Sequence, residues 1–401
     1  MKKIYYGKAV YNNKEINAVL SVLKNDSLTL IDGKKVKELE KTVSKIFGKK
    51  YGLMVNSGSS ANLLALSSFK FKKGSEVITP NLTFSTTVAP IYQLGLIPHF
   101  VGVEENKFIA DPKHIEKCIN KKTVAIMIPN LLGNIADWKK IHSIAKKYKL
   151  KVIEDSADTI GYSINKNHAG KYSDVVTNSF YASHIINGAG TGGIVCFNDY
   201  KLYEKAKLLR GWGRSSATFN ESESVNKRFN IKVSGIDYDA KYIFSDLGYN
   251  FLPSEISAAF ALEQIKKLKN NIKIRNKNFE YLKNFFSRYK NYFKLPEQNK
   301  GVVTPWLAFP LVIKKNHKFN RKQMQIFFEK KNIQTRTIFT GNILKQPVMS
   351  NRQFKKHPSC DPIANDVMKN GILLGCHQGM VKSDLDYICK TFLKFINWWN
   401  Y

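Results

Sequence analysis

Seven short apolar runs, rich in Val and Ile, stand out before residue 200. They are YGLMVN (51–56), SEVITP (75–80), IPHFVGV (97–103), TVAIMIP (123–129), LKVIED (150–155), DVVTNSF (174–180) and GGIVCF (192–197). Longer stretches with helical spacing, such as 60–71 and 137–149, separate the first five runs. This alternation predicts an α/β protein with a mainly parallel, seven-stranded sheet. Because the last two runs lie close together, we expect strands of opposite direction there.

The pattern changes in the C-terminal third of the chain. A long helical stretch at 254–290 is followed by a strand (306–315), a helix (321–332), a strand (333–340) and a closing helix (383–396). We therefore predict a large domain over residues 1–265 and a smaller C-terminal α/β domain over residues 266–401.

The formal net charge is +33, from 64 basic and 31 acidic residues. Such a balance is typical of proteins that bind nucleic acid or an anionic surface. The Lys and Arg residues are spread along the chain in short pairs and form no long basic block, so we expect no nucleic-acid partner. A positive field still raises the encounter rate with an acidic small substrate, such as a nucleotide-linked one.

The sequence shows no run of about 18 apolar residues, and its basic start lacks the apolar core of a signal peptide. The five cysteines, at 118, 196, 360, 376 and 389, form no C-x-x-C pair and no tight cluster. This spacing argues against zinc and against a locally ligated iron–sulfur cluster. We expect a cytoplasmic protein with reduced thiols, no metal site and no membrane partner.

One candidate site is the stretch VNSGSSANLLA (55–65), which reads as a strand end, a Gly/Ser turn and a helix start. Free backbone N–H groups at a helix N-terminus favour a phosphate. A plain N-cap role for Ser59 or Ser60 is an equal alternative.

A second candidate site is VIEDSAD (152–158), which closes an apolar strand with Glu154, Asp155 and Asp158. Strand alternation directs Glu154 and Asp155 to opposite sides, so at most one of them normally faces a site. A carboxylate in this place is a familiar partner for the cationic ring nitrogen of a pyridoxal cofactor. A capping or surface carboxylate is the alternative.

A third candidate site is NSFYASHIINGAGTGG (178–193), in which four glycines fall within six residues. A turn dense in glycine allows the backbone to approach a neighbour closely. Ser179 is a candidate phosphate contact, and His184 is a candidate for proton transfer near neutral pH. A structural role is the more common one for a single histidine.

The stretches NSGSSANLLA, PNLTFSTT, IEDSAD, SFYASH and GYN together resemble the DegT-type sugar aminotransferase family over about residues 8–395. Its members are fold-type I enzymes that depend on pyridoxal phosphate (PLP) or pyridoxamine phosphate (PMP). The resemblance implies a cofactor phosphate held by Gly58, Ser59 and Ser179, a pyridine ring stacked on Phe84, and a ring nitrogen paired with Asp155. It also implies a homodimer with shared active sites, in which Asn250 reaches the neighbouring phosphate. Core packing is the alternative for Phe84.

The resemblance departs from the family at one decisive position. The usual stretch is SFHATK, whose lysine binds the cofactor covalently, whereas this chain has His184 there. Imidazole moves protons but does not replace the lysine as a stable anchor. This substitution resembles the sugar 3-dehydratase branch of the family, as do Asp158, where the aminotransferases generally have Gln, and the segments 335–347 and 375–379.

The branch implies a PMP-dependent reaction that removes the C3 hydroxyl of a nucleotide-linked 4-keto-6-deoxyhexose. His184 would move a proton at the C4′ carbon of the cofactor, Asp158 would assist nearby, and glutamate would be the amino donor.

CDP-sugar members of the branch carry a cysteine-ligated [2Fe–2S] cluster after a GWGR sequence. Here the segment after GWGR, residues 215–226, has no Cys. The favoured substrate class is therefore a GDP-linked sugar, and the reaction is expected to need no iron–sulfur cluster. An aminotransferase and a catalytically silent sugar-nucleotide-binding homologue are the alternatives.

Overall fold

A computed structural model of the protein describes residues 3–24, 29–219, 224–315 and 318–400. Its large sheet has the strand order β1-β9-β8-β5-β4-β2-β3-β15. The strands are β1 (Tyr51–Val55), β2 (Glu76–Pro80), β3 (Ile97–Val101), β4 (Thr123–Pro129), β5 (Lys151–Asp155), β8 (Val175–Ser179), β9 (Gly193–Phe197) and β15 (Lys355–Lys356). Seven of them coincide with the seven predicted runs, and the two-residue edge strand β15 adds an eighth.

The sheet is mainly parallel. β9 runs antiparallel to both of its neighbours, β8 and β1, which confirms the expected reversal at the last two runs. The other pairs are parallel. Because parallel strands end at the same edge of a sheet, β4, β5 and β8 bring their last residues together.

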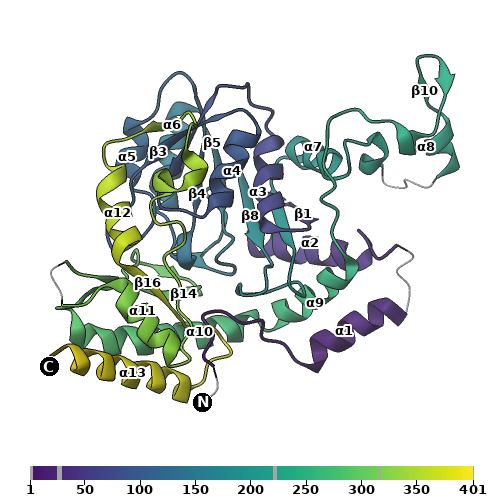
Figure 1. Ribbon diagram of the computed structural model, residues 1–401. Helices are drawn as coiled ribbons and strands as arrows, with labels where there is room; N and C mark the ends of the chain where they lie inside the picture. The colour runs from purple at the N-terminus through teal and green to yellow at the C-terminus, as the bar shows by residue number, and fades with distance from the viewer. Residues whose placement is uncertain (1–2, 25–28, 220–223, 316–317, 401) are drawn as a thin grey trace.

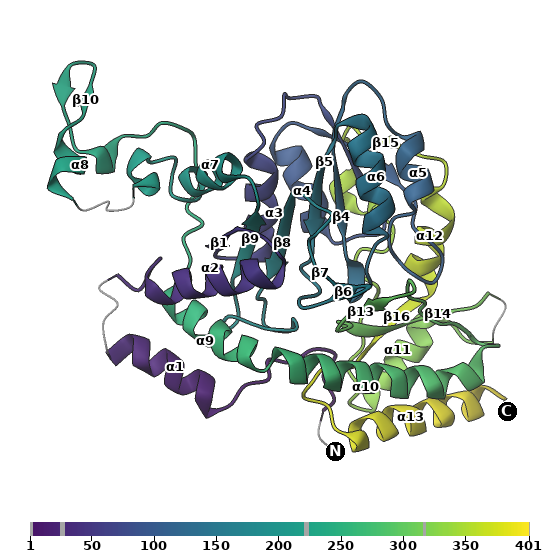
Figure 2. The same cartoon turned by 180° about the vertical axis from the view of Figure 1, so that it is seen from behind.

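Helices cover both faces of this sheet (Figures 1 and 2). One face packs against α2 (Lys34–Ile46), α5 (Pro112–Lys117), α6 (Trp138–Tyr148) and α9 (Glu255–Lys266). The other face packs against α3 (Gly58–Ser67), α4 (Ser85–Gln93) and α7 (Tyr200–Arg210). Side chains alternate along β1. Met54 packs in the core on the α2, α5, α6 and α9 face, whereas Leu53 and Val55 pack in the core on the α3, α4 and α7 face.

A further hydrophobic core, the C-terminal core, comes mostly from the C-terminal part of the chain, with contributions from residues such as Leu82, Phe108 and Leu131. Its sheet has the order β12-β14-β16, with β12 (Phe293–Lys294), β14 (Ala308–Ile313) and β16 (Gly371–Gly375). Its helices are α10 (Leu268–Phe286), α11 (Arg321–Lys330), α12 (Cys360–Asn370) and α13 (Lys382–Asn400). The predicted strand at 306–315 and the helices at 321–332 and 383–396 are thereby confirmed.

The predicted strand at 333–340 is wrong. Ile333 and Arg336 form isolated bridges, to Ile4 and Leu373 respectively, and the backbone then turns at Phe339, whose φ is 43°. β14 pairs with β12 on one side and with β16, rather than with residues 333–340, on the other. The sequence pattern gives no sign of β16, because α12 ends at Asn370 and the strand begins at the next residue, with no loop to mark the change from helix to strand.

The long helical stretch at 254–290 is two helices, α9 and α10, which Lys267 separates. Its ammonium lies 2.6 Å from Glu15 Oε2 on α1 (Asn13–Lys24). This break lies beside the expected boundary between residues 1–265 and 266–401. The boundary stays a prediction, since Ile4 from the start of the chain packs into the C-terminal core.

The remaining elements are small. β6 (Ser163–Ile164), β7 (Asn167–His168) and β13 (Val302–Val303) form one sheet. α8 (Val225–Phe229) and the hairpin of β10 (Lys232–Val233) and β11 (Ile236–Asp237) project from the body in both views (Figures 1 and 2). In the part of the chain that the structure describes, no helix is both long and apolar enough to cross a bilayer.

Candidate functional site

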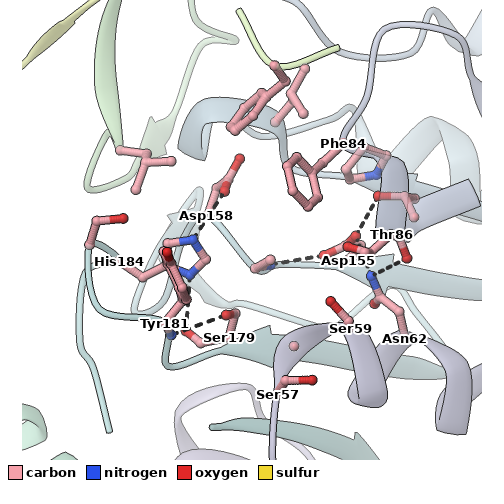
Figure 3. A pocket seen from close by; sticks show the side chains of 18 of the residues that line it. Ser57, Ser59, Asn62, Phe84, Thr86, Asp155, Asp158, Ser179, Tyr181 and His184 are labelled. Atoms are coloured by element: carbon pink, nitrogen blue, oxygen red, sulfur yellow. Dashed lines mark hydrogen bonds and ion pairs between the residues drawn. The ribbon is translucent and has the colours of Figure 1, made fainter. Parts of the chain in front are cut away.

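A cavity of about 400 Å³ opens at the edge of the large sheet where β4, β5 and β8 end. The predicted site residues that line it are Gly58, Ser59, Phe84, Asp155, Asp158, Ser179 and His184 (Figure 3). Asn250 lies outside this cavity: it is exposed and forms a bridge with Gly211. The structure therefore brings together seven of the eight predicted residues within one chain.

The N-terminus of α3 forms one wall of the cavity. Ser57 is its N-cap, and the Ser60 N–H donates to Ser57 Oγ over 3.1 Å. The alternative in which Ser59 or Ser60 caps the helix is therefore wrong. Ser59 lies on the first turn beside the cavity (Figure 3), where free N–H groups favour an anion.

Gly58 and Gly193 allow the start of α3, the end of β8 and the start of β9 to pack closely behind this wall. A Cβ on Gly58 would lie 2.6 Å from Ser179 Cβ, and a Cβ on Gly193 would lie 2.4 Å from the Ser57 carbonyl oxygen. Only glycine permits such approaches. The Gly-dense turn of the sequence thus packs the start of β9 against the start of α3.

Asp155 ends β5 on the floor of the cavity and is 4% exposed. Its Oδ2 accepts hydrogen bonds from Asn62 Nδ2 (2.8 Å) and Thr87 Oγ1 (2.7 Å), and its Oδ1 accepts one from the Ala157 N–H (3.1 Å). Burial raises the pKa of Asp155, and these three bonds oppose that rise. The alternative of a surface carboxylate is excluded.

The neighbouring carboxylate, Glu154, points away from the cavity. It accepts hydrogen bonds from Tyr162 Oη, Ser156 Oγ (2.7 Å) and Asn130 Nδ2 (3.1 Å). This network is fully buried and structural. The expected alternation, with at most one of the two acids facing the site, is confirmed.

His184 faces Asp158 across the cavity, with 4.0 Å between Nε2 and Asp158 Oδ1 (Figure 3). The Nδ1 atom lies 3.4 Å from the carbonyl oxygen of Ser179. A hydrogen on Nδ1 that bonds this carbonyl leaves Nε2 as the basic nitrogen. Asp158 accepts the Leu132 N–H over 2.8 Å, and Leu132 holds a left-handed φ of 62° to present it.

Burial sets the protonation of this pair. It lowers the pKa of His184 to about 4, and it raises the pKa of Asp158 to about 7, with the charge of Asp155 adding to that rise. At neutral pH the imidazole is therefore uncharged, and the pKa of Asp158 lies in the neutral range. The pair is suited to proton transfer rather than to a permanent ion pair.

Phe84 begins the turn into α4 and is 48% exposed. Its ring meets Phe339 edge to face, with 5.8 Å between the centroids. Core packing, the alternative for this residue, is wrong. The ring is available to stack on a flat group in the cavity.

Sequence reasoning missed several residues that line the cavity. Asn62 carried a usable signal, because it follows Gly58 by one helical turn on α3. Tyr6 and Phe339 carried none, since they arrive from the N-terminal segment and from the C-terminal core. The Tyr6 N–H donates to Gln334 Oε1 over 3.0 Å, which fixes that segment beside the cavity.

All five cysteines are buried and free. In the described parts of the chain, no group of three or more His, Cys, Asp or Glu side chains is placed to hold a metal ion. Residues 220–223 of the segment after GWGR lie outside the described residues.

The residues of the cavity fit PLP or PMP. Asp155 is a buried acid with three neutral donors, and no ion pair to it occurs among the described residues. A protonated ring nitrogen would supply the missing cation. The α3 N-terminus suits the phosphate, and the half-exposed Phe84 suits the ring.

Two curated relatives match nearly the whole chain. The lipopolysaccharide biosynthesis protein RfbH of Salmonella typhimurium is 33% identical over 89% of this chain and 84% of its own length. The GDP-4-keto-6-deoxy-D-mannose 3-dehydratase of Escherichia coli O55:H7 is 32% identical over 95% of this chain and 97% of its own.

Solved structures agree with these matches. GDP-4-keto-6-deoxymannose-3-dehydratase with a trapped PLP-glutamate geminal diamine superposes with a TM-score of 0.86 at 30% identity, covering 97% of this chain and 99% of that one. The family model described as the DegT/DnrJ/EryC1/StrS aminotransferase family matches residues 10–393. The chain belongs to the DegT/DnrJ/EryC1/StrS aminotransferase family.

Proposed function

We propose that this protein is a PMP-dependent sugar-nucleotide 3-dehydratase, a lyase that removes the C3 hydroxyl of a nucleotide-linked 4-keto-6-deoxyhexose. The observation that carries the proposal is an imidazole, His184, in the cavity position where the family's usual sequence has its lysine. Imidazole provides a base without a stable covalent anchor. A curated relative that matches 95% of the chain is a GDP-sugar 3-dehydratase, which supports this reaction and a GDP-linked substrate.

PMP, when bound, supplies the amine that condenses with the C4 ketone and a ring that accepts electrons as the C3 hydroxyl leaves. Asp155 holds a proton on the ring nitrogen, because a buried carboxylate favours the cationic ring. Gly58, Ser59 and Ser179 bind the phosphate at the α3 N-terminus. Phe84 covers the ring face.

With the cofactor bound, His184 would take a proton from its C4′ carbon with the neutral Nε2. Its pKa of about 4 keeps that nitrogen free at neutral pH. Asp158, whose pKa is raised to about 7, orients the imidazole and exchanges protons with it. General acid–base steps of this kind contribute about 10²- to 10⁴-fold in rate.

Glutamate is the proposed amino donor that restores the amine after each turnover. The solved dehydratase with its trapped PLP-glutamate geminal diamine supports this choice. A cytoplasmic location belongs to the same proposal, and the five free, buried thiols support a reducing compartment.

A homodimer with shared active sites completes the proposal. The arm, residues 224–247, exposes apolar side chains such as Val225 (70%), Ile236 (66%) and Leu247 (93%). Exposed apolar groups on one projecting segment favour burial against another copy. Asn250 follows the arm and lies outside its own chain's cavity, as a residue that serves the neighbouring site would.

Light scattering checks the assembly. Wild-type protein is expected at the mass of a dimer, and the double variant Ile236→Ser, Leu247→Ser at the mass of a monomer. An unchanged mass in the variant contradicts the role of the arm.

The function is tested by incubating the protein with PMP, glutamate and a GDP-linked 4-keto-6-deoxyhexose, with CDP and dTDP analogues in parallel. A dehydratase gives a sugar lighter by one oxygen atom, because hydrogen replaces the C3 hydroxyl. An amino group in place of the C4 oxygen indicates an aminotransferase, and an unchanged sugar indicates a silent homologue. Stoichiometric iron and sulfide in the pure protein would contradict the cluster-free reaction.

A further inference from the structure

Arg275, on α10, is a fully buried cation beneath the His184 turn. Its Nε donates to Gln378 Oε1 over 2.7 Å, and its Nη1 donates to the carbonyl oxygens of Trp306 and Leu307, each over 3.1 Å. Its Nη2 lies 3.5 Å from the carbonyl oxygen of His184. No acidic side chain among the described residues pairs with it, so the guanidinium charge is solvated by neutral oxygens alone.

Burying a charge without a partner of opposite charge is costly, and hydrogen bonds to neutral oxygens offset only part of that cost. Packing alone therefore does not account for a guanidinium in this place. Its donors instead connect the C-terminal core to the turn that carries His184. Gln378 extends this connection, because its Nε2 lies 3.5 Å from the carbonyl oxygen of Ile185.

We propose that Arg275 is a positioning residue for the reaction, which fixes the main chain of the His184 turn and places a permanent positive charge behind the imidazole. The inference rests on the proposed function for its meaning in catalysis. Its physical content, an electrostatic and geometric link between α10 and the imidazole, is measurable without turnover.

The charge acts on the protonation of His184. Burial is the main cause of the low pKa of His184, and the nearby guanidinium lowers that pKa further. The titratable or charged groups around His184 and Arg275 are Tyr6, Asp158, Tyr181, Arg336, Cys376 and His377. The thiol of Cys376 and the phenol of Tyr6 have pKa values raised by burial, so both are neutral at pH 7. Asp158 is the group in this set whose charge opposes that of Arg275.

Three variants separate the two roles. Arg275→Met removes both the charge and the hydrogen bonds at similar length. Gln378→Glu keeps Arg275 but neutralises it with a carboxylate in the same place, and it serves where Arg275→Met fails to fold. Arg275→Lys keeps the charge but loses the fork that reaches several carbonyls at once. Arg321→Met is the matched control, because Arg321 also donates to a backbone carbonyl, that of Lys369, remote from the cavity.

The experiment is an NMR pH titration of the PMP-loaded protein labelled at histidine Cε1, with the His184 signal assigned by its loss in His184→Asn. In Arg275→Met and Gln378→Glu the His184 pKa is expected to rise by about one unit. In Arg275→Lys and Arg321→Met it is expected to stay at the wild-type value. The His184 pKa staying at that value in both charge-neutralising variants would overturn the proposal.

Steady-state kinetics supply a second readout. Arg275→Lys is expected to lower kcat about 10- to 100-fold with a KM near that of the wild type, because the imidazole is displaced while the substrate still binds. Undiminished kcat in Arg275→Lys would overturn the geometric role. Where wild-type protein shows no dehydratase turnover, the proposed function fails, and the titration alone still decides the link.

Discussion

Asp155 and Asp158 follow the same strand three residues apart, and the structure holds them in different ways. Asp155 accepts three hydrogen bonds that use both of its oxygens. Asp158 accepts one, from Leu132, and lies 4.0 Å from the His184 ring. Both are buried, but only the first is surrounded by donors.

This difference separates a fixed charge from a mobile proton. Three donors stabilise the ionised form of Asp155, as an acid that must stay charged beside a ring nitrogen requires. A single donor leaves the pKa of Asp158 at about 7, where a proton moves at little cost. One strand end thus provides two acids whose surroundings suit them to different tasks.

The largest expected effect on the reaction rate comes from a change at His184, the partner of Asp158. His184→Asn removes the base and should lower kcat by about 10²- to 10⁴-fold. PMP affinity, measured by fluorescence titration, should stay within about twofold, because the contacts proposed for its phosphate and its ring come from other residues.

His142→Asn is the matched control for this substitution, since His142 is exposed and binds only the Tyr172 carbonyl among the described residues. If His184→Asn were as active as this control, His184 would have no role in the reaction. The proposed difference between His184 with Asp158 and the fixed charge of Asp155 would then fail.

Asp155→Asn tests the fixed charge. Loss of the anion leaves the protonated ring without its partner and should weaken PMP binding about 10²- to 10³-fold, in line with the removal of one member of a buried pair. Equilibrium dialysis with PMP measures this. Asp158→Asn should change PMP affinity little, and equal losses in both variants would contradict the division of tasks.

In the cofactor-free protein, Asp158 and His184 should make the free energy of unfolding depend on pH in opposite directions. The pKa of Asp158 is raised from 3.8 to about 7, so its stabilising contribution is present below pH 3.8 and lost as the pH rises through 7. The pKa of His184 is lowered from 6.5 to about 4, so its contribution is present above pH 6.5 and lost as the pH falls through 4. Over its titration, each group changes the free energy of unfolding by roughly 3–4 kcal/mol. The two changes have opposite signs and largely cancel.

Single variants should uncover these two pH dependences. Relative to wild type, Asp158→Asn should gain stability in urea unfolding as the pH rises from 4 to 7. His184→Asn should lose stability relative to wild type as the pH rises from 4 to 6.5. Curves that run parallel to that of the wild type in both variants would show that the pair is not buried as described.

The smallest effect should come from Phe84→Leu. Replacing the ring keeps apolar contact but removes the stacking face, which is worth about 1 kcal/mol beyond area, so PMP affinity should fall about fivefold. Phe84→Tyr is the control and should retain the affinity. A loss as large as that of Asp155→Asn would place the main cofactor contact at this ring.

The sequence predicted what is local and continuous. The seven apolar runs became strands because most of the side chains on both faces of each run are buried. The Gly58 and Asp155 motifs lie at the ends of β1 and β5, at the same edge of the large sheet. Tyr6 and Phe339 could not be predicted as cavity residues, since pairings far along the chain bring them there. The 333–340 run was assigned to a strand because apolar composition does not reveal which partner strand is available.

The position of Tyr6 has a consequence for the order of assembly. The carbonyl of Tyr5 meets His377 Nε2 at 3.2 Å, and Ile4 exchanges backbone hydrogen bonds with Asn332 and Gln334. During translation, Tyr6 is made before Asn332, Gln334 and His377, so the segment that carries it cannot be fixed until these later residues have been added. The first seven strands of the large sheet are complete once residue 197 has been added, whereas the wall of the cavity that Tyr6 forms can be fixed only after residue 377 has been added.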